Sequence, residues 1–230
     1  MPKNSPDRAG GHPGSRDLIP VVRVPAGLVV LVGPPASGKT SFVRALVERR
    51  QVDAEAVVSS DEIRAELFGA SCESAPAASD SAVSDSDSAD PDSADSDAAD
   101  ARIFEERDRR IAARLTAGRG VIAESTNVTP QARARLIAIA RHFGAPVTVL
   151  RFDPDVTDLL QQYTERGRAD MTAADVRSYA AVMSRDAGAD RIRSEGADAV
   201  HEVPGRRQAT TPAEAAARFS FERLPAGVRR

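Results

Sequence analysis

The residues that most clearly predict chemistry are a short glycine-rich segment that contains one lysine. This segment fits the pattern G-x-x-x-x-G-K-[ST]. In such a loop the backbone N–H groups surround a triphosphate, the lysine reaches the outer phosphates, and the final hydroxyl binds Mg²⁺. The residues expected to contact the nucleotide are Gly33, Pro34, Pro35, Ala36, Ser37, Gly38, Lys39, Thr40 and Ser41.

Lysine is almost absent from the chain, which makes its use in this loop informative. The sequence contains Lys3, in a polar N-terminal segment, and Lys39; every other basic residue is arginine. A lysine ammonium is a compact point charge, whereas an arginine guanidinium is a planar fork. The retained lysine indicates that the loop needs a point charge at this position.

Two further polar clusters follow apolar runs of the chain. Asp61 and Arg64 are three residues apart, so on a helix they share a face. There a carboxylate could accept a proton from a hydroxyl, and an arginine could grip an anion. Glu124 ends another apolar run, where an acid could orient Mg²⁺, and Thr126 and Asn127 could contact a substrate. Helix capping with a surface arginine, and a capped turn, remain the alternatives.

The fourth candidate is a pair of arginines, Arg166 and Arg168, on either side of Gly167. Arginines on a loop that closes over a phosphoryl group stabilise the charge of the transition state. A solvated helix end is the alternative for these two residues.

The elements that must position these clusters alternate between strand and helix. Short apolar runs predict strands over 28–32, 56–58, 121–123, 147–152 and 199–203, with helical patterns between them. This alternation predicts an α/β fold, a three-layer sandwich with a parallel sheet of about five strands and helices on both faces. Ligands of such sheets bind beyond the carboxyl ends of the strands, where the polar clusters stand.

The composition divides the chain into a central domain and polar flanks. We expect a disordered leader over 1–20, a domain over 21–204 and an Arg-rich tail over 205–230. A Ser/Asp/Ala-rich insertion over 71–101 carries nine acids and no base, and is expected to be disordered. The whole chain has a net charge of −3, to which the insertion contributes nine negative charges. The tail has six arginines and two glutamates, and the leader adds one positive charge, so the remaining core is close to neutral. A neutral core does not favour binding of a long nucleic acid.

The sequence also limits the compartment. A single cysteine, Cys72, excludes an intramolecular disulfide, and no run of about 20 apolar residues suggests a membrane span. The polar N-terminus does not resemble a signal peptide. We therefore expect a soluble, cytoplasmic protein, and nothing in the sequence indicates a protein partner.

In order and spacing, the four clusters resemble the P-loop kinases of the polynucleotide-kinase type and related small ATP-dependent kinases. The resemblance covers roughly residues 25–204. It implies an ATP- and Mg²⁺-dependent kinase in which Asp61 is the general base and Lys39 and Arg166 stabilise the transition state. It also implies that Arg64 and Thr126 contact the acceptor.

Two departures from the family pattern leave alternatives open. Glu124 stands where the family has Asp, and Gln162 stands where a first lid arginine is expected. Either Asp61 or Glu124 could be the main metal-orienting group, beside Thr40. A binding-only ATP regulator is the competing hypothesis. The acceptor, a polynucleotide 5′-hydroxyl or a small-molecule alcohol, stays undecided.

The acidic insertion follows directly after the Asp61–Arg64 helix, near the expected acceptor side. Its aspartates could compete with an anionic acceptor for arginines. A tolerated surface insertion is the alternative, because long surface loops cost little free energy.

Overall fold

Parallel strands form the centre of the fold in the computed structural model, which describes residues 21–69, 91–166 and 172–222. Five strands make one sheet in the order β3-β4-β2-β5-β6, and every neighbouring pair is parallel. Their bounds are β2 Leu28–Val32, β3 Val57–Ser59, β4 Val121–Glu124, β5 Val147–Arg151 and β6 Ala199–Glu202. The predicted five-stranded parallel sheet is confirmed.

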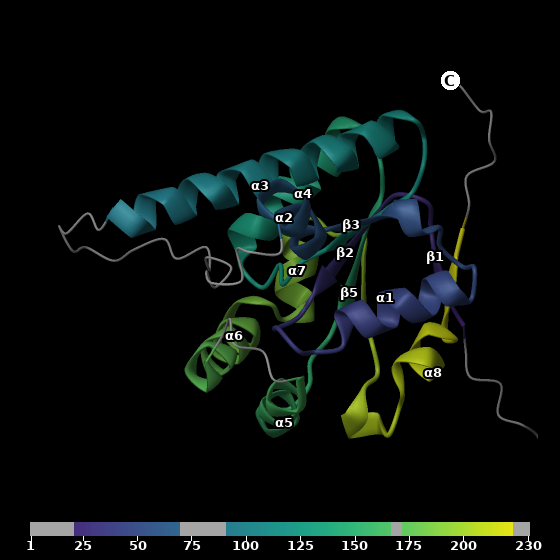
Figure 1. The fold of residues 1–230 in the computed structure, drawn as a ribbon. Coiled ribbons are helices and arrows are strands. Elements are labelled where there is room, and N and C mark those ends of the chain that lie inside the picture. Colours follow the sequence, from purple (N-terminus) through teal and green to yellow (C-terminus); the bar gives the residue numbers. More distant parts are fainter. Residues whose placement is uncertain (1–20, 70–90, 167–171, 223–230) are drawn as a thin grey trace, which may run out of the picture.

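Helices cover both faces of this sheet (Figure 1). Residues of α2, α3, α4, α6 and α7 pack on one face, and residues of α1 and α8 pack on the other. The helix bounds are α1 Lys39–Glu48, α2 Ser60–Phe68, α3 Pro91–Thr116, α4 Pro130–His142, α5 Val156–Arg166, α6 Ala173–Asp186, α7 Ala189–Glu195 and α8 Pro212–Ala216, with 3₁₀ turns at Ala54–Ala56 and Arg206–Gln208. The three-layer α/β sandwich is therefore confirmed.

Strand β2 lies in the middle of the sheet and shows why its sequence is a continuous apolar run. Leu28, Val30 and Val32 belong to the core on the α3–α4 face. Val29 and Leu31 belong to the core on the α1 face. Because successive side chains of a strand point to opposite faces, a strand covered on both faces needs apolar residues throughout. This burial fixes the strand from which the glycine-rich loop departs.

The folded unit continues beyond the expected boundary at residue 204. Strands β1 Val22–Val24 and β7 Phe219–Phe221 form a separate parallel pair, and α8 packs against α1. The Phe219 ring meets the Phe42 ring edge-on, with centroids 5.6 Å apart. The expectation of a tail from residue 205 is wrong for 205–222, because Ala215, Ala216 and Phe219 are buried in one core cluster with residues of α1.

The acidic insertion also differs from its prediction. Helix α3 begins at Pro91, so residues 91–101, expected to be disordered, belong to a helix. Proline suits the first position of a helix and aspartates suit its first turns. The composition of the segment hid this start, since Ser and Asp dominate both loops and helix N-termini. The rest of the insertion and the expected leader over 1–20 lie outside the described residues.

No helix within the described ranges is long and apolar enough to cross a bilayer.

Candidate functional site

The glycine-rich loop joins the end of β2 to the start of α1, as its motif predicts. Gly38 caps the N-terminus of α1 with a φ of 93°, a left-handed conformation that favours glycine. A Cβ atom on Gly33 would lie 2.8 Å from Cβ of Phe152, so only glycine fits there. The Gly33 amide donates to the carbonyl of Thr126 at 2.9 Å, which ties the loop to the strand beside it.

Lys39 stands inside this loop. Its Nζ donates to the carbonyls of Gly33 and Pro34, both at 2.7 Å, and to Ser37 Oγ at 3.3 Å. The residue is buried, with 8% of its surface exposed. The loop oxygens therefore compensate the ammonium for its lost solvation. The arrangement holds a positive charge at the centre of the loop.

Thr40 and Glu124 meet directly beside the lysine. Thr40 Oγ1 donates to Glu124 Oε1 at 2.6 Å. Burial raises the pKa of the Glu124 carboxyl above its usual value, and the nearby Asp61 and Glu62 carboxylates add to this. The Thr40 hydrogen bond and the Lys39 charge act in the opposite direction. The favourable contacts with Thr40 and Lys39 therefore do not fully offset the cost of burying the charged Glu124 carboxylate.

The oxygens of Thr40 and Glu124 fit Mg²⁺. Mg²⁺ in nucleotide sites is bound through one or two carboxylates, waters and substrate phosphates rather than a full protein cage. In the described ranges no three His, Cys, Asp or Glu side chains converge as a metal cage. A cation at the carboxylate would also offset the burial that disfavours its charged form.

Helix α2 starts next to Glu124. Ser59, which pairs in register with Glu124, caps the helix by accepting from the Glu62 amide. Asp61 lies exposed in the first turn of this helix, which the sequence predicted to follow the strand. Arg64, predicted to contact the acceptor, forms an ion pair with Asp100 of α3. The structure therefore brings Asp61 to the loop edge, but pairs Arg64 with a carboxylate of the protein.

The two predicted substrate contacts after β4, Thr126 and Asn127, have different environments. Thr126 is half-buried and its carbonyl anchors Gly33. Asn127 is only 2% exposed, and its Nδ2 donates to the carbonyl of Leu31 at 2.8 Å. The structure does not favour a direct substrate contact by Asn127, because its side chain is buried and its amide donates to β2. Asn127 instead fixes the turn, with a φ of 47°.

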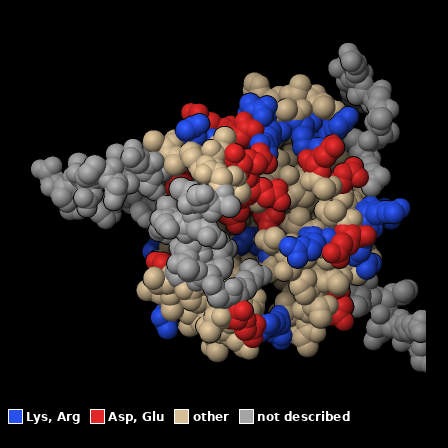
Figure 2. Space-filling view, viewed as in Figure 1, with Lys and Arg blue, Asp and Glu red and all other residues tan. Residues whose placement is uncertain are grey.

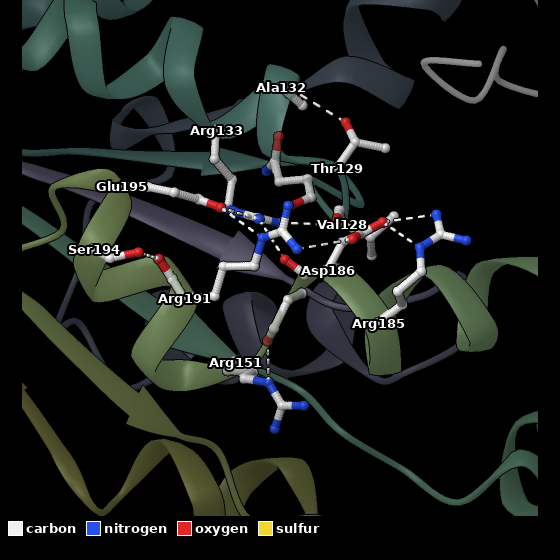
Figure 3. Close-up of polar contacts among 12 residues, drawn as sticks. Val128, Thr129, Ala132, Arg133, Arg151, Arg185, Asp186, Arg191, Ser194 and Glu195 are labelled. Atoms are coloured by element: carbon white, nitrogen blue, oxygen red, sulfur yellow. Dashed lines mark hydrogen bonds and ion pairs between the residues drawn. The ribbon is translucent and has the colours of Figure 1, made fainter. Parts of the chain in front are cut away.

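A buried arginine on α4 holds this turn from behind (Figure 3). Arg133 is fully buried, and its Nη1 donates to the carbonyls of Asn127 at 3.1 Å and Val128 at 2.7 Å. Its Nη2 donates to the carbonyl of Asp186 at 2.7 Å, and Nε and Nη2 both donate to Glu195. All five N–H groups of the guanidinium therefore have an acceptor.

Our sequence analysis missed Arg133. A lone arginine in a helix usually lies on the surface. The spacing of the residues could have predicted its burial, because position 133 shares one helical face with the buried Leu136, Ile137 and Ala140.

The predicted lid arginines lie at the edge of the described residues. Arg166 is the last residue of α5, and its side chain is not described. Arg168 lies outside the described residues. Gln162 and Glu165 of α5 line a cavity, and Glu165 pairs with Arg206 at 3.2 Å.

That cavity opens beside the glycine-rich loop and has a volume of about 670 Å³. Ser37 and Gly38 form one wall, and the chain after β6 forms another. Its polar and proline lining includes Arg151, Pro204, Arg206, Arg207, Gln208 and Arg218. Most of these positions fall in the segment that we expected to be a tail, so the sequence analysis did not assign them to the site.

Comparisons with known proteins agree with this architecture. The AAA domain family matches residues 28–187. No curated protein matches the sequence. A structure of the Pnkp1/Rnl/Hen1 RNA repair complex is 19% identical with a TM-score of 0.51, and the match covers 75% of this chain but only 47% of that one. A structure described as a candidate kinase from Chloroflexus aurantiacus is 17% identical, with a TM-score of 0.53 and coverage of 84% and 92%.

These likenesses concern the fold, since the identities are low. The family match and the two structures confirm the predicted AAA-type domain and its fold.

Proposed function

The chain belongs to the AAA domain family, and on this premise we propose that it is an ATP- and Mg²⁺-dependent kinase that phosphorylates a hydroxyl group. One observation carries the proposal: Lys39 in the loop, the hydrogen-bonded pair Thr40–Glu124 and the exposed Asp61 lie together at one edge of the sheet. Phosphoryl transfer needs a binding place for the donor phosphates, a metal-binding pair and a base, and these residues would supply all three.

The donor nucleotide would occupy the loop and the cavity beside it. Loop amides at the start of α1 and the Lys39 ammonium suit the phosphates. The cavity of about 670 Å³ has the size of small-molecule sites and suits an adenosine group. Thr40 and Glu124 would hold Mg²⁺, which when bound neutralises phosphate charge and orients the chain of phosphates.

The residues of the chain would then position and stabilise the transfer. The acceptor oxygen attacks the γ-phosphorus, its proton passes to the Asp61 carboxylate, and the bond from the γ-phosphorus to the β,γ-bridging oxygen breaks to release ADP. Lys39 stabilises the charge that develops on the transferred group, with Arg166 as a proposed second cation. Thr126, half-buried at the same edge, is a proposed acceptor contact. Arg168 is a further proposed contact with the substrate.

A transfer assay with γ-labelled ATP tests the proposal. The acceptor panel contains 5′-hydroxyl RNA and DNA, nucleosides, sugars and amino-alcohols, and Lys39→Met is the matched variant. We expect label in one alcohol class, and loss of transfer in Lys39→Met with an unchanged circular dichroism spectrum. Equal transfer by both proteins would refute the assignment.

The same assay addresses the binding-only alternative, which Gln162 at the expected lid position favours. A non-catalytic protein would gain thermal stability from Mg-ATP, yet would label no acceptor.

A further inference from the structure

The ion pair between Arg64 and Asp100 joins the acceptor side of the site to α3. Arg64 Nη2 donates to Asp100 Oδ1. The Asp100 side chain is 8% exposed and the Arg64 side chain 21% exposed, so the pair is largely shielded from water. The two helices pack closely along this stretch. The contact is therefore a partly buried link between the two helices.

The carboxylate of Asp100 binds the Arg64 guanidinium, which would otherwise be available to bind a phosphate. A guanidinium recognises carboxylate and phosphate with the same N–H groups. A partly buried pair also cancels most of the field of each charge. An anionic acceptor would have to compete with the Asp100 carboxylate for the Arg64 guanidinium, and breaking this shielded ion pair costs free energy. The pair thus removes the attraction that Arg64 would offer to an anion.

The charges around this pair oppose an anionic acceptor as well. Helix α2 carries three acids, Asp61, Glu62 and Glu66, and only one base, Arg64. Glu66 is bound to Arg110 of α3, but Asp61 and Glu62 lie exposed near Glu124. Figure 2 shows acidic side chains gathered over α2 and the middle of α3, with basic ones beside them. With Arg64 neutralised, the start of α2 presents net negative charge.

We propose that Asp100 is a specificity-determining residue: by neutralising Arg64 it directs the site to alcohols that carry no phosphate group. This inference rests on the proposed function, which places the acceptor beside α2. It narrows the acceptor to uncharged or amine-bearing alcohols and argues against polynucleotide ends. It also gives one aspartate of the acidic segment a definite role.

Two acceptors with the same hydroxyl test the inference. Cytidine and cytidine 3′-phosphate both offer a 5′-hydroxyl, and only the second adds a phosphate. Transfer from ATP is measured as kcat/KM for wild type, Asp100→Asn and Asp108→Asn. The last variant is the matched control, because it removes one carboxylate from the same helix, where Asp108 binds Arg107 and Arg135 instead of Arg64. Binding of both compounds in the presence of Mg²⁺ and a non-hydrolysable ATP analogue is measured in parallel by calorimetry.

We expect wild type to show no preference for cytidine 3′-phosphate. Asp100→Asn should raise the ratio of phosphate-bearing to phosphate-free acceptor by about tenfold, in kcat/KM or in affinity, because one unit of opposing charge is removed. Asp108→Asn should leave the ratio unchanged. Asp100→Ser serves as a second variant if the amide is not tolerated.

Two results would overturn the inference: a wild-type preference for cytidine 3′-phosphate of about tenfold or more, or an unchanged ratio in Asp100 variants that remain folded and bind the ATP analogue. Failure of the proposed function would look different. Wild type would then label no alcohol in the whole acceptor panel, while the binding ratio would still report on Asp100.

Discussion

Arg133 and Glu195 form a largely buried, bidentate ion pair: Nε and Nη2 of Arg133 donate to the two carboxylate oxygens of Glu195, each at 2.7 Å. The pair connects α4 to α7. The same guanidinium holds the carbonyls of Asn127 and Val128, next to the carbonyl that anchors Gly33. A single side chain thus supports the turn on which the glycine-rich loop rests.

Replacing Arg133 should destabilise the fold strongly. Arg133→Gln removes both short contacts of the largely buried Glu195 carboxylate, which keeps only the exposed Arg191 at 3.8 Å. It also removes this donor from several carbonyls, and loss of one partner of a buried pair costs about 3–5 kcal/mol. Urea unfolding measures this change. Arg135→Gln on the same helix is the control: its side chain is 49% exposed, so the loss should stay below about 1 kcal/mol. Equal effects of the two variants would contradict the role given to Arg133.

Removing the charge of Glu124 should stabilise the protein at neutral and higher pH. Burial raises the folded-state pKa of this carboxyl above its usual 4.5. Ionisation therefore costs more in the folded than in the unfolded state, and this cost is absent below the unfolded-state pKa and complete above the raised folded-state pKa. Glu124→Gln cannot ionise, so its melting temperature should exceed that of wild type increasingly as pH rises.

Thermal melts of both proteins from about pH 4 to pH 8 check this, since the series starts below the usual pKa of the carboxyl and continues above it. A difference in melting temperature that does not change with pH would contradict the assignment. Glu124→Gln should also weaken the stabilisation that Mg-ATP gives relative to ATP with a chelator, because Mg²⁺ would lose its carboxylate.

Phe219 should matter as much as a residue of the central sheet, although it lies in the segment that we first expected to be a tail. It is 2% exposed and packs on Phe42 of α1. Phe219→Ala should cost about 3–5 kcal/mol of unfolding free energy, because it leaves a cavity against α1. Val21→Ala, at an exposed position beside β1, is the control in the same urea titration. A loss below about 1 kcal/mol would show that the C-terminal segment is dispensable for the fold.

The features that the sequence predicted well are local ones. The glycine-rich loop, strand β2 and the N-cap of α4 by Thr129, with Pro130 at its first position, depend on residues that are neighbours in the chain. The five strands were predicted from apolar runs, and their parallel pairing followed from the helices between them. These elements were predictable because each has its cause within a few residues.

Features that depend on distant partners were not predictable in this way. Asn127 looked like a substrate contact because nothing in its surroundings reveals that its amide reaches β2. Arg64 looked like an acceptor contact because Asp100 lies 36 residues away, beyond a low-complexity stretch. The pair β1–β7 joins the two ends of the described chain, so neither strand has a local signal of its own.

The central claim is that the start of α2 holds the base of a phosphotransferase, and the rate of γ-phosphoryl transfer by Asp61→Asn tests it most directly. Glu62→Gln is the matched control, since both acids lie exposed in the first turn of α2. Loss of a general base should lower kcat by about 10²–10⁴-fold with ATP affinity retained. Glu62→Gln should stay within about threefold of wild type, because its carboxylate has no proposed contact with the reacting atoms. Transfer by Asp61→Asn at the wild-type rate would contradict the account.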